Sequence, residues 1–160
     1  EFRRVLFRSA CAAAGAHELV NYEQENLREA INRLSGGRGV DVCFDAVGDR
    51  FTEPAVRGMA WNGRFLMVGF AAGSIPRIAL NLPLLKGCAI LGVKAGTHWQ
   101  KSPQQSRAMV GELLDHIAAG RLRPFVSATY PLARTADALH AMRTRQARGK
   151  VVVVMDAATG

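Results

Sequence analysis

The sequence GRGVDVCFDAVGDRFTEPAVRGMAWNGRFLMVGF, residues 37–70, decides the fold of this chain. It contains two apolar runs, residues 40–47 and 65–70, and each ends in small residues beside a glycine. Such runs are typical of strands that are buried on both faces, as in a parallel sheet covered by helices. The stretch therefore predicts two parallel strands, at residues 40–47 and 65–70.

The segment between the two runs predicts a helix. Residues 52–54 (TEP) have the composition of a helix start, because a proline in the first turn costs no internal hydrogen bond. Val56, Met59 and Ala60 then recur at the three-and-four spacing of one helical face. Residues 61–63 (WNG) are expected to turn the chain into the second strand. A strand, a helix and a parallel strand form a right-handed crossover.

The remainder of the chain continues the alternation of strands and helices. Helices are expected over residues 10–14, 25–34, 80–85, 103–119 and 135–145, and strands over residues 18–22, 88–94, 125–130 and 150–155. This alternation predicts the α/β class. Residues 1–9 (EFRRVLFRS) differ in character from the rest of the chain, so we interpret them as a non-native or mistranslated lead.

Composition limits the function classes. The 160 residues are 49% hydrophobic, and no apolar run has the length of a membrane span. The net charge is +8, but the arginines are spread singly and without interleaved aromatic residues, which disfavours nucleic-acid binding. Cys11, Cys43 and Cys88 are odd in number and widely spaced. They predict neither disulfides nor a zinc site, but small buried residues of a reduced, cytoplasmic protein.

Few residues suggest catalysis. The four histidines are scattered without metal-ligand spacing, and neither a glycine-rich phosphate loop nor a nucleophile elbow is present. We therefore predict no catalytic residue and no metal ligand in this chain. Asp45, near the end of a buried strand, must bond either to a ligand or to the turn that follows it. Arg143, Arg145 and Arg148 could hold a phosphate, or could simply form a solvated helix end.

The ends of the two predicted strands suggest a binding site. Ligands of parallel sheets bind beyond the carboxyl ends of the strands, where glycine lets the backbone approach a bound molecule closely. Gly48 and Gly69 occupy these positions. A cofactor site is the favoured interpretation, and the alternative is that both glycines only turn the chain.

Seven segments, taken in order, resemble the zinc-free quinone oxidoreductase branch of the medium-chain dehydrogenase/reductase superfamily. They are GAHELVNY (15–22), GRGVDVCFDAVG (37–48), GRFLMVGFAAGSIP (63–76), LNLPLLKG (80–87), ILGV (90–93), AAGRLRPFVSATYPL (118–132) and RGKVVV (148–153). Each segment alone is weakly informative, but their ordered occurrence over residues 10–156 is specific.

The resemblance implies a partial doubly wound (Rossmann) parallel sheet over residues 10–95. Residues 96–156 would complete that domain and supply the C-terminal segment of a GroES-like catalytic domain, followed by a tail at 157–160. It also implies an NADPH-dependent enzyme, a homodimer when full length, that passes a hydride to a quinone or an activated alkene. The positions that match cofactor-binding residues of the family are Tyr22, Val47, Gly48, Val68, Gly69, Phe70, Ala71, Val93, Lys94, Ala95 and Arg145.

Parts of the family pattern have no counterpart in this sequence. These parts are the N-terminal catalytic half, the first strand–helix–strand unit with its glycine-rich turn, and the residue that recognises the 2′-phosphate. The chain is therefore expected to correspond to the C-terminal half of such an enzyme and to be inactive alone. Alternatives are a reductase of unsaturated thioesters or aldehydes, and a non-catalytic binding module.

Overall fold

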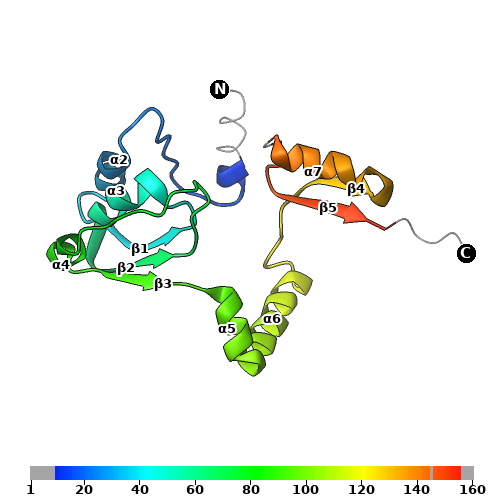
Figure 1. The fold of residues 1–160 in the computed structure, drawn as a ribbon. Helices are drawn as coiled ribbons and strands as arrows, with labels where there is room; N and C mark the ends of the chain where they lie inside the picture. The colour runs from blue at the N-terminus through cyan, green and yellow to red at the C-terminus, as the bar shows by residue number, and fades with distance from the viewer. Residues whose placement is uncertain (1–9, 145, 156–160) are drawn as a thin grey trace, which may run out of the picture. The chain divides into compact units, whose positions relative to one another are not determined.

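The computed structural model describes residues 10–144 and 146–155 (Figure 1). The described chain divides into two compact units. One unit comprises residues 16–102, and the other contains residues 10–15 and the described residues from 103 onward.

A three-stranded parallel sheet forms the centre of the first unit. Its strands are β1 (Val40–Asp45), β2 (Met59–Met67) and β3 (Ala89–Gly92), hydrogen-bonded in the order β1-β2-β3. The helices of this unit are α2 (Leu27–Leu34), η1 (Asp49–Phe51), α3 (Thr52–Arg57), α4 (Asn81–Lys86) and α5 (Ala95–Lys101). The prediction of an α/β fold with parallel strands is confirmed.

One face of the sheet carries the core. Phe65 in β2 is fully buried and packs in one cluster with Val56 of α3 and Leu82 of α4. Phe44 of β1, one residue along from Cys43 and therefore on the opposite face, is 68% exposed. The prediction that β1 is buried on both faces is therefore wrong, because the described helices of this unit cover only one face.

The helix between β1 and β2 is shorter than its apolar spacing predicted. It ends at Arg57, where the N–H of Gly58 donates to the carbonyls of Pro54 and Ala55. Met59 and Ala60 are instead the first residues of β2, and both are buried. Met59 and Ala60 fit the buried start of a strand as well as they fit the helical face that contains Val56. The three-and-four spacing therefore did not predict where the helix ends.

The predicted turn at residues 61–63 lies inside β2. Asn62 has φ +60°, and the pairing with β1 shifts register there, since Val40 pairs with Met59 but Val42 pairs with Arg64. The chain therefore bends where the sequence predicted, but without leaving the strand. The shift is a bulge, which accommodates extra residues in one strand of a pair.

Residues 18–22 do not form the predicted strand. The chain instead turns at Asn21, whose carbonyl accepts the N–H groups of Gln24 and Glu25 at 2.8 and 3.0 Å. The preceding helical residues 10–13 end near Gly15 at φ +97°, as expected. Strand β3 lies within the predicted strand at residues 88–94, and it is exposed along its four residues.

The second unit contains a smaller parallel pair. Strands β4 (Val126–Pro131) and β5 (Lys150–Val154) are hydrogen-bonded, and α7 (Thr135–Arg143) packs on them through Ala138 and Ala141. The other helices of this unit are α6 (Pro103–Ala118) and η2 (Leu132–Arg134). Helix α6 begins directly after Ser102, as the sequence predicted.

Two further expectations concern the burial of the cysteines and the absence of a membrane span. Cys43 and Cys88 are half-buried, but Cys11 is exposed, so the prediction of a buried residue is wrong there. None of the helices in the described ranges is long and apolar enough to cross a membrane.

Gly39 gives a test of how closely β1 and β2 approach. It has φ +84°, and a Cβ at this position would lie 2.7 Å from the carbonyl oxygen of Gly58 and from the nitrogen of Ala60. We expect Gly39→Ala to lower the free energy of unfolding by about 3 kcal/mol or more, because it adds a backbone clash to the strain of a positive φ. Urea denaturation measures the loss.

Gly36→Ala is the matched control. Gly36 has φ +61°, but a Cβ there would meet nothing within 4 Å. Its loss should be about 1 kcal/mol, from backbone strain alone. Equal losses for the two variants would contradict the close approach.

Candidate functional site

The segments that follow the three parallel strands meet at one edge of the sheet. Asp45 pairs with Met67, and Met67 pairs with Gly92, so the strands end side by side. Because all three run in the same direction, the residues after them leave from the same edge, which we call the carboxyl edge. It brings together the predicted cofactor residues Val47, Gly48, Val68, Gly69, Phe70, Ala71, Val93, Lys94 and Ala95.

Backbone hydrogen bonds continue across the carboxyl edge beyond the strand ladder. The N–H of Val68 donates to the carbonyl of Asp45 at 2.8 Å, and the N–H of Ala71 donates to Ala46 at 3.1 Å. On the other side, the N–H of Val93 donates to the carbonyl of Met67 at 2.9 Å. The loops at this edge are therefore tied to one another and present a fixed surface.

Gly48 allows the first loop to lie against the second. It has φ +73°, and a Cβ there would come within 2.8 Å of the Phe70 ring. At Gly69, a Cβ would lie 3.4 Å from the carbonyl oxygen of Ala46. The contact between the two loops is sufficient to explain a glycine at position 48, so Gly48 has a structural function whether or not a ligand is bound.

Asp45 caps the turn that follows its own strand. Its Oδ1 accepts the N–H groups of Val47 at 2.8 Å and Gly48 at 2.9 Å, and its Oδ2 accepts the hydroxyl of Thr52 at 2.8 Å. Asp45 and Thr52 are both buried. Of the two alternatives that the sequence left open, the structure supports the turn cap, because the carboxylate is occupied by donors of this chain.

The charge of Asp45 also affects Cys43, two residues earlier in β1. Burial, and secondarily the nearby Asp45 carboxylate, raise the pKa of the Cys43 thiol to about 11. The thiol therefore stays protonated at neutral pH and does not supply a nucleophile at this edge.

Tyr22 lies against the turn that follows Gly48. Its ring meets the ring of Phe51 edge-on, with centroids 4.6 Å apart, and Arg50 lies over the same Phe51 ring at 5.0 Å. Arg50 also pairs with Glu23 at 3.3 Å. The sequence analysis did not predict that Phe51 and Arg50 contact Tyr22 and Glu23. A local sequence pattern carries no information on contacts between residues almost thirty positions apart.

The remaining predicted site residues are exposed or lie outside the described chain. Lys94 and Ala95 connect β3 directly to α5 and are exposed. Arg145 lies outside the described residues. Its neighbour Arg143, in the last turn of α7, is exposed with its guanidinium 3.4 Å from His140 Nδ1.

The described chain offers no place for a metal ion. In residues 10–144 and 146–155, no three His, Cys, Asp or Glu side chains gather closely enough to bind one. These side chains do not fit a zinc site.

A parallel sheet whose loops gather at the carboxyl edge defines an α/β protein of the open-sheet class, and comparison with known proteins gives its family. A family model described as zinc-binding dehydrogenase matches residues 14–153. The chain is 34% identical over 140 residues to a quinone oxidoreductase-like protein 2 homolog of Nematostella vectensis, covering 87% of this chain and 38% of that protein. It is 27% identical over 144 residues to a 2-haloacrylate reductase of a Burkholderia species, covering 89% and 43%.

Solved structures show the same fold. A crystal structure of 2-haloacrylate reductase aligns with a TM-score of 0.81 at 26% identity, covering 94% of this chain and 47% of that one. The Escherichia coli quinone oxidoreductase, crystallised with NADPH, aligns at 0.77 with 23% identity, covering 91% and 45%.

The chain belongs to the zinc-binding dehydrogenase family, within the quinone oxidoreductase branch of the medium-chain dehydrogenase/reductase superfamily. It spans about two fifths of the length of the curated relatives that it matches.

Replacing Asp45 tests whether its carboxylate organises the carboxyl edge. Asp45→Ala would leave two backbone N–H groups and the Thr52 hydroxyl without their acceptor in a buried setting. We expect the free energy of unfolding to fall by about 3 kcal/mol or more, since each orphaned donor is costly. Asp41→Ala, in the same strand but exposed and paired with the exposed Arg38, should stay close to wild type. Similar losses for both would contradict the cap.

Proposed function

We propose that this chain forms part of the NADPH-binding wall of an oxidoreductase that passes a hydride to a quinone or an activated alkene. The observation that carries the proposal is the carboxyl edge, where the loops after three parallel strands are joined by backbone hydrogen bonds. Ligands of open parallel sheets bind at such edges.

The side chains of the edge suit a nicotinamide cofactor. Val47, Phe70 and Val93 are apolar, yet each is close to two fifths exposed. Exposed apolar side chains on a fixed backbone offer a flat contact for a planar ring and exclude water from it. Small residues between them, such as Gly69 and Ala71, leave the backbone accessible. The residues present therefore fit the proposed cofactor.

The proposed mechanism depends on positioning. When bound, the cofactor supplies the hydride, and the chain holds the nicotinamide face against the place of the substrate. The sequence predicts no catalytic residue in this chain, the Asp45 carboxylate is occupied by its own turn, and the Cys43 thiol is protonated at neutral pH. Groups that polarise the substrate would come from residues outside this chain, in a protein as long as the relatives.

The names of the relatives support the proposed substrate class. They are named as quinone oxidoreductases and as a reductase of a halogenated acrylate. Both substrate types accept a hydride because a conjugated carbonyl group withdraws electrons from the reacting carbon. An electron-poor double bond is thus the proposed substrate feature, and unsaturated thioesters or aldehydes remain the alternative within the superfamily.

Further parts of the proposal concern the longer protein. Residues 10–95 would belong to its dinucleotide-binding domain, and residues 96–156 would complete that domain and the catalytic domain. Arg145 would grip a phosphate of NADPH, and Tyr22 would lie near the adenosine. The exposed edge of β3 would pair with its copy in a homodimer, since an open apolar edge strand invites pairing. Absence of zinc and a cytoplasmic location stay predictions.

Activity should require more than these 160 residues. We expect the purified chain to show no quinone-dependent oxidation of NADPH, because most pyrophosphate contacts and the substrate wall would come from elsewhere. A protein that carries this chain at the length of its relatives should show it. The assay is the loss of NADPH absorbance with a small quinone or an acrylate. Turnover by the short chain, or none by the long protein with either substrate, would refute the proposal.

Val47 provides a test of the cofactor's place that does not depend on turnover. Its side chain is 42% exposed, so a polar replacement should be tolerated by the fold. In the longer protein, Val47→Glu should weaken NADPH binding by roughly tenfold or more, because it sets a carboxylate beside a polyanion. Val47→Lys, of similar size and opposite charge, should weaken it much less. Equal dissociation constants by fluorescence titration would place the cofactor elsewhere.

A further inference from the structure

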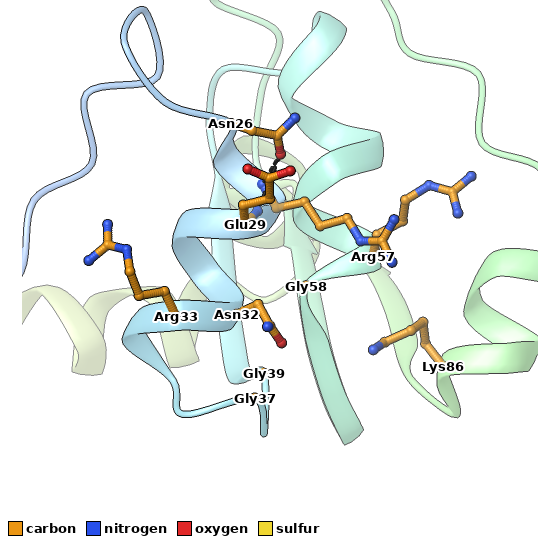
Figure 2. A pocket seen from close by; sticks show the side chains of 10 residues that line it. Asn26, Glu29, Asn32, Arg33, Gly37, Gly39, Arg57, Gly58 and Lys86 are labelled. Atoms are coloured by element: carbon orange, nitrogen blue, oxygen red, sulfur yellow. Dashed lines mark hydrogen bonds between the residues drawn. The ribbon is translucent and has the colours of Figure 1, made fainter.

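A hollow of about 530 Å³ opens at the other end of the parallel strands. Gly39 lies directly before β1, Gly58 directly before β2, and Lys86 shortly before β3, and all three line it. Figure 2 shows Arg33 on one side of this hollow and Arg57 and Lys86 on the other, with Asn32 between them. The hollow is therefore at the amino edge of the sheet, opposite the carboxyl edge.

A second hollow of about 630 Å³ adjoins the first. The two share Asn26, Arg28 and Arg57 as lining residues. The further lining of the second hollow is partly apolar and partly charged, and consists of Asp49, Arg50, Glu53, Pro54, Ile75, Pro76, Arg77 and Ile78. We call the two together the arginine groove.

Cationic side chains outnumber acidic ones in the arginine groove. Six basic side chains line it, against Glu29, Asp49 and Glu53. Some of the basic residues are neutralised by ion pairs: Arg33 with Glu25, Arg50 with Glu23 and Arg57 with Glu53. Within the described chain, Arg28, Arg77 and Lys86 have no acidic partner.

Helix electrostatics explain some of these cations but not Arg28. Arg33, Arg57 and Lys86 stand in the last turns of α2, α3 and α4, where a positive charge complements the helix dipole. Arg28 is the second residue of α2, at the positive end of the helix, where a cation is unfavourable. It also shares a wall of the groove with the like-charged Arg57. The positive charge of Arg28 and the positive end of α2 therefore add at this wall of the groove, which favours an anion there.

The groove also offers a neutral donor beside Arg28. The Asn26 Oδ1 accepts the N–H groups of Arg28 at 3.0 Å and Glu29 at 3.2 Å as the cap of α2. This fixes the amide, and its Nδ2 donates to no other group in the described part of the chain. Guanidinium and amide N–H groups that line the same groove can both donate to the oxygens of a phosphate group.

We propose that the arginine groove binds a small organic phosphate with two or more negative charges. Arg28 holds the phosphate oxygens at the wall that the two hollows share, with Asn26 as a further donor. Lys86 extends the positive charge along the amino edge. The less polar part of the ligand lies along Ile75, Pro76 and Ile78, which supply the apolar lining of the second hollow.

The test uses inorganic pyrophosphate as the probe and the full 160-residue chain. Isothermal titration at low salt should give measurable binding that weakens as salt is added, as expected for an exposed cationic site. Arg28→Gln should raise the dissociation constant at least tenfold, because it removes the charged fork but keeps a side chain of similar length. Arg107→Gln, an exposed arginine of α6, is the matched control and should bind as wild type.

A thermal midpoint and a second variant complete the test. Without pyrophosphate, the thermal midpoint of Arg28→Gln should equal or exceed that of wild type, because an unfavourable cation is removed from the helix start. A lower midpoint would mean that Arg28 has a structural partner and would overturn the proposal. Lys86→Gln provides a second variant, and the loss of this unpaired cation should also weaken pyrophosphate binding.

The Val47→Glu variant separates the groove from the carboxyl edge. It should leave pyrophosphate binding unchanged if the probe sits in the groove. Absence of binding in wild type, equal dissociation constants for wild type and Arg28→Gln, or a loss in Val47→Glu instead would overturn the proposal. The last of these results would assign the anion to the carboxyl edge.

Discussion

The buried carboxylate of Asp45 is the interaction on which the carboxyl edge depends. It accepts two backbone N–H groups of the turn after β1 and the hydroxyl of Thr52, the first residue of α3. One side chain thereby fixes where the strand ends, how the loop bends and where the next helix begins. Only with the loop in this position can Gly48 lie against Phe70 and the carbonyls of residues 46 and 47 accept N–H groups from the neighbouring loop.

A buried charge is stable here because donors of the chain replace the water it loses. Burial of an unpaired carboxylate would be strongly unfavourable, whereas hydrogen bonds to a charged acceptor are stronger than neutral ones. The arrangement has an effect on its surroundings, since the same charge helps to raise the pKa of the Cys43 thiol. The edge thus gains a fixed backbone and loses a possible nucleophile, which suits a surface that positions a ligand and takes no covalent part in a reaction.

Sequence patterns predicted what depends on local order and missed what depends on partners. Apolar runs followed by glycine identified β1, β2 and the edge at which their loops meet. The burial of Phe44 was wrongly predicted, because alternation along a strand cannot tell which faces are covered. Residues 18–22 have strand-like composition, but without a neighbouring strand they turn at Asn21. The function of Asp45 stayed open, since spacing does not reveal whether its donors belong to the chain or to a ligand.

The geometry of the sheet also separates the carboxyl edge from the exposed face. Pairing places Asp45 in one row with Met67, and Phe44 in the next row with Leu66 and Leu91. Successive rows of a sheet point to opposite faces, so the row of Phe44 points away from the core that surrounds Phe65. A further layer that covered Phe44 would therefore leave the hydrogen bonds of Asp45 untouched. The order of the carboxyl edge is a property of residues 45–93 themselves, and a longer protein would add to this edge without having to build it.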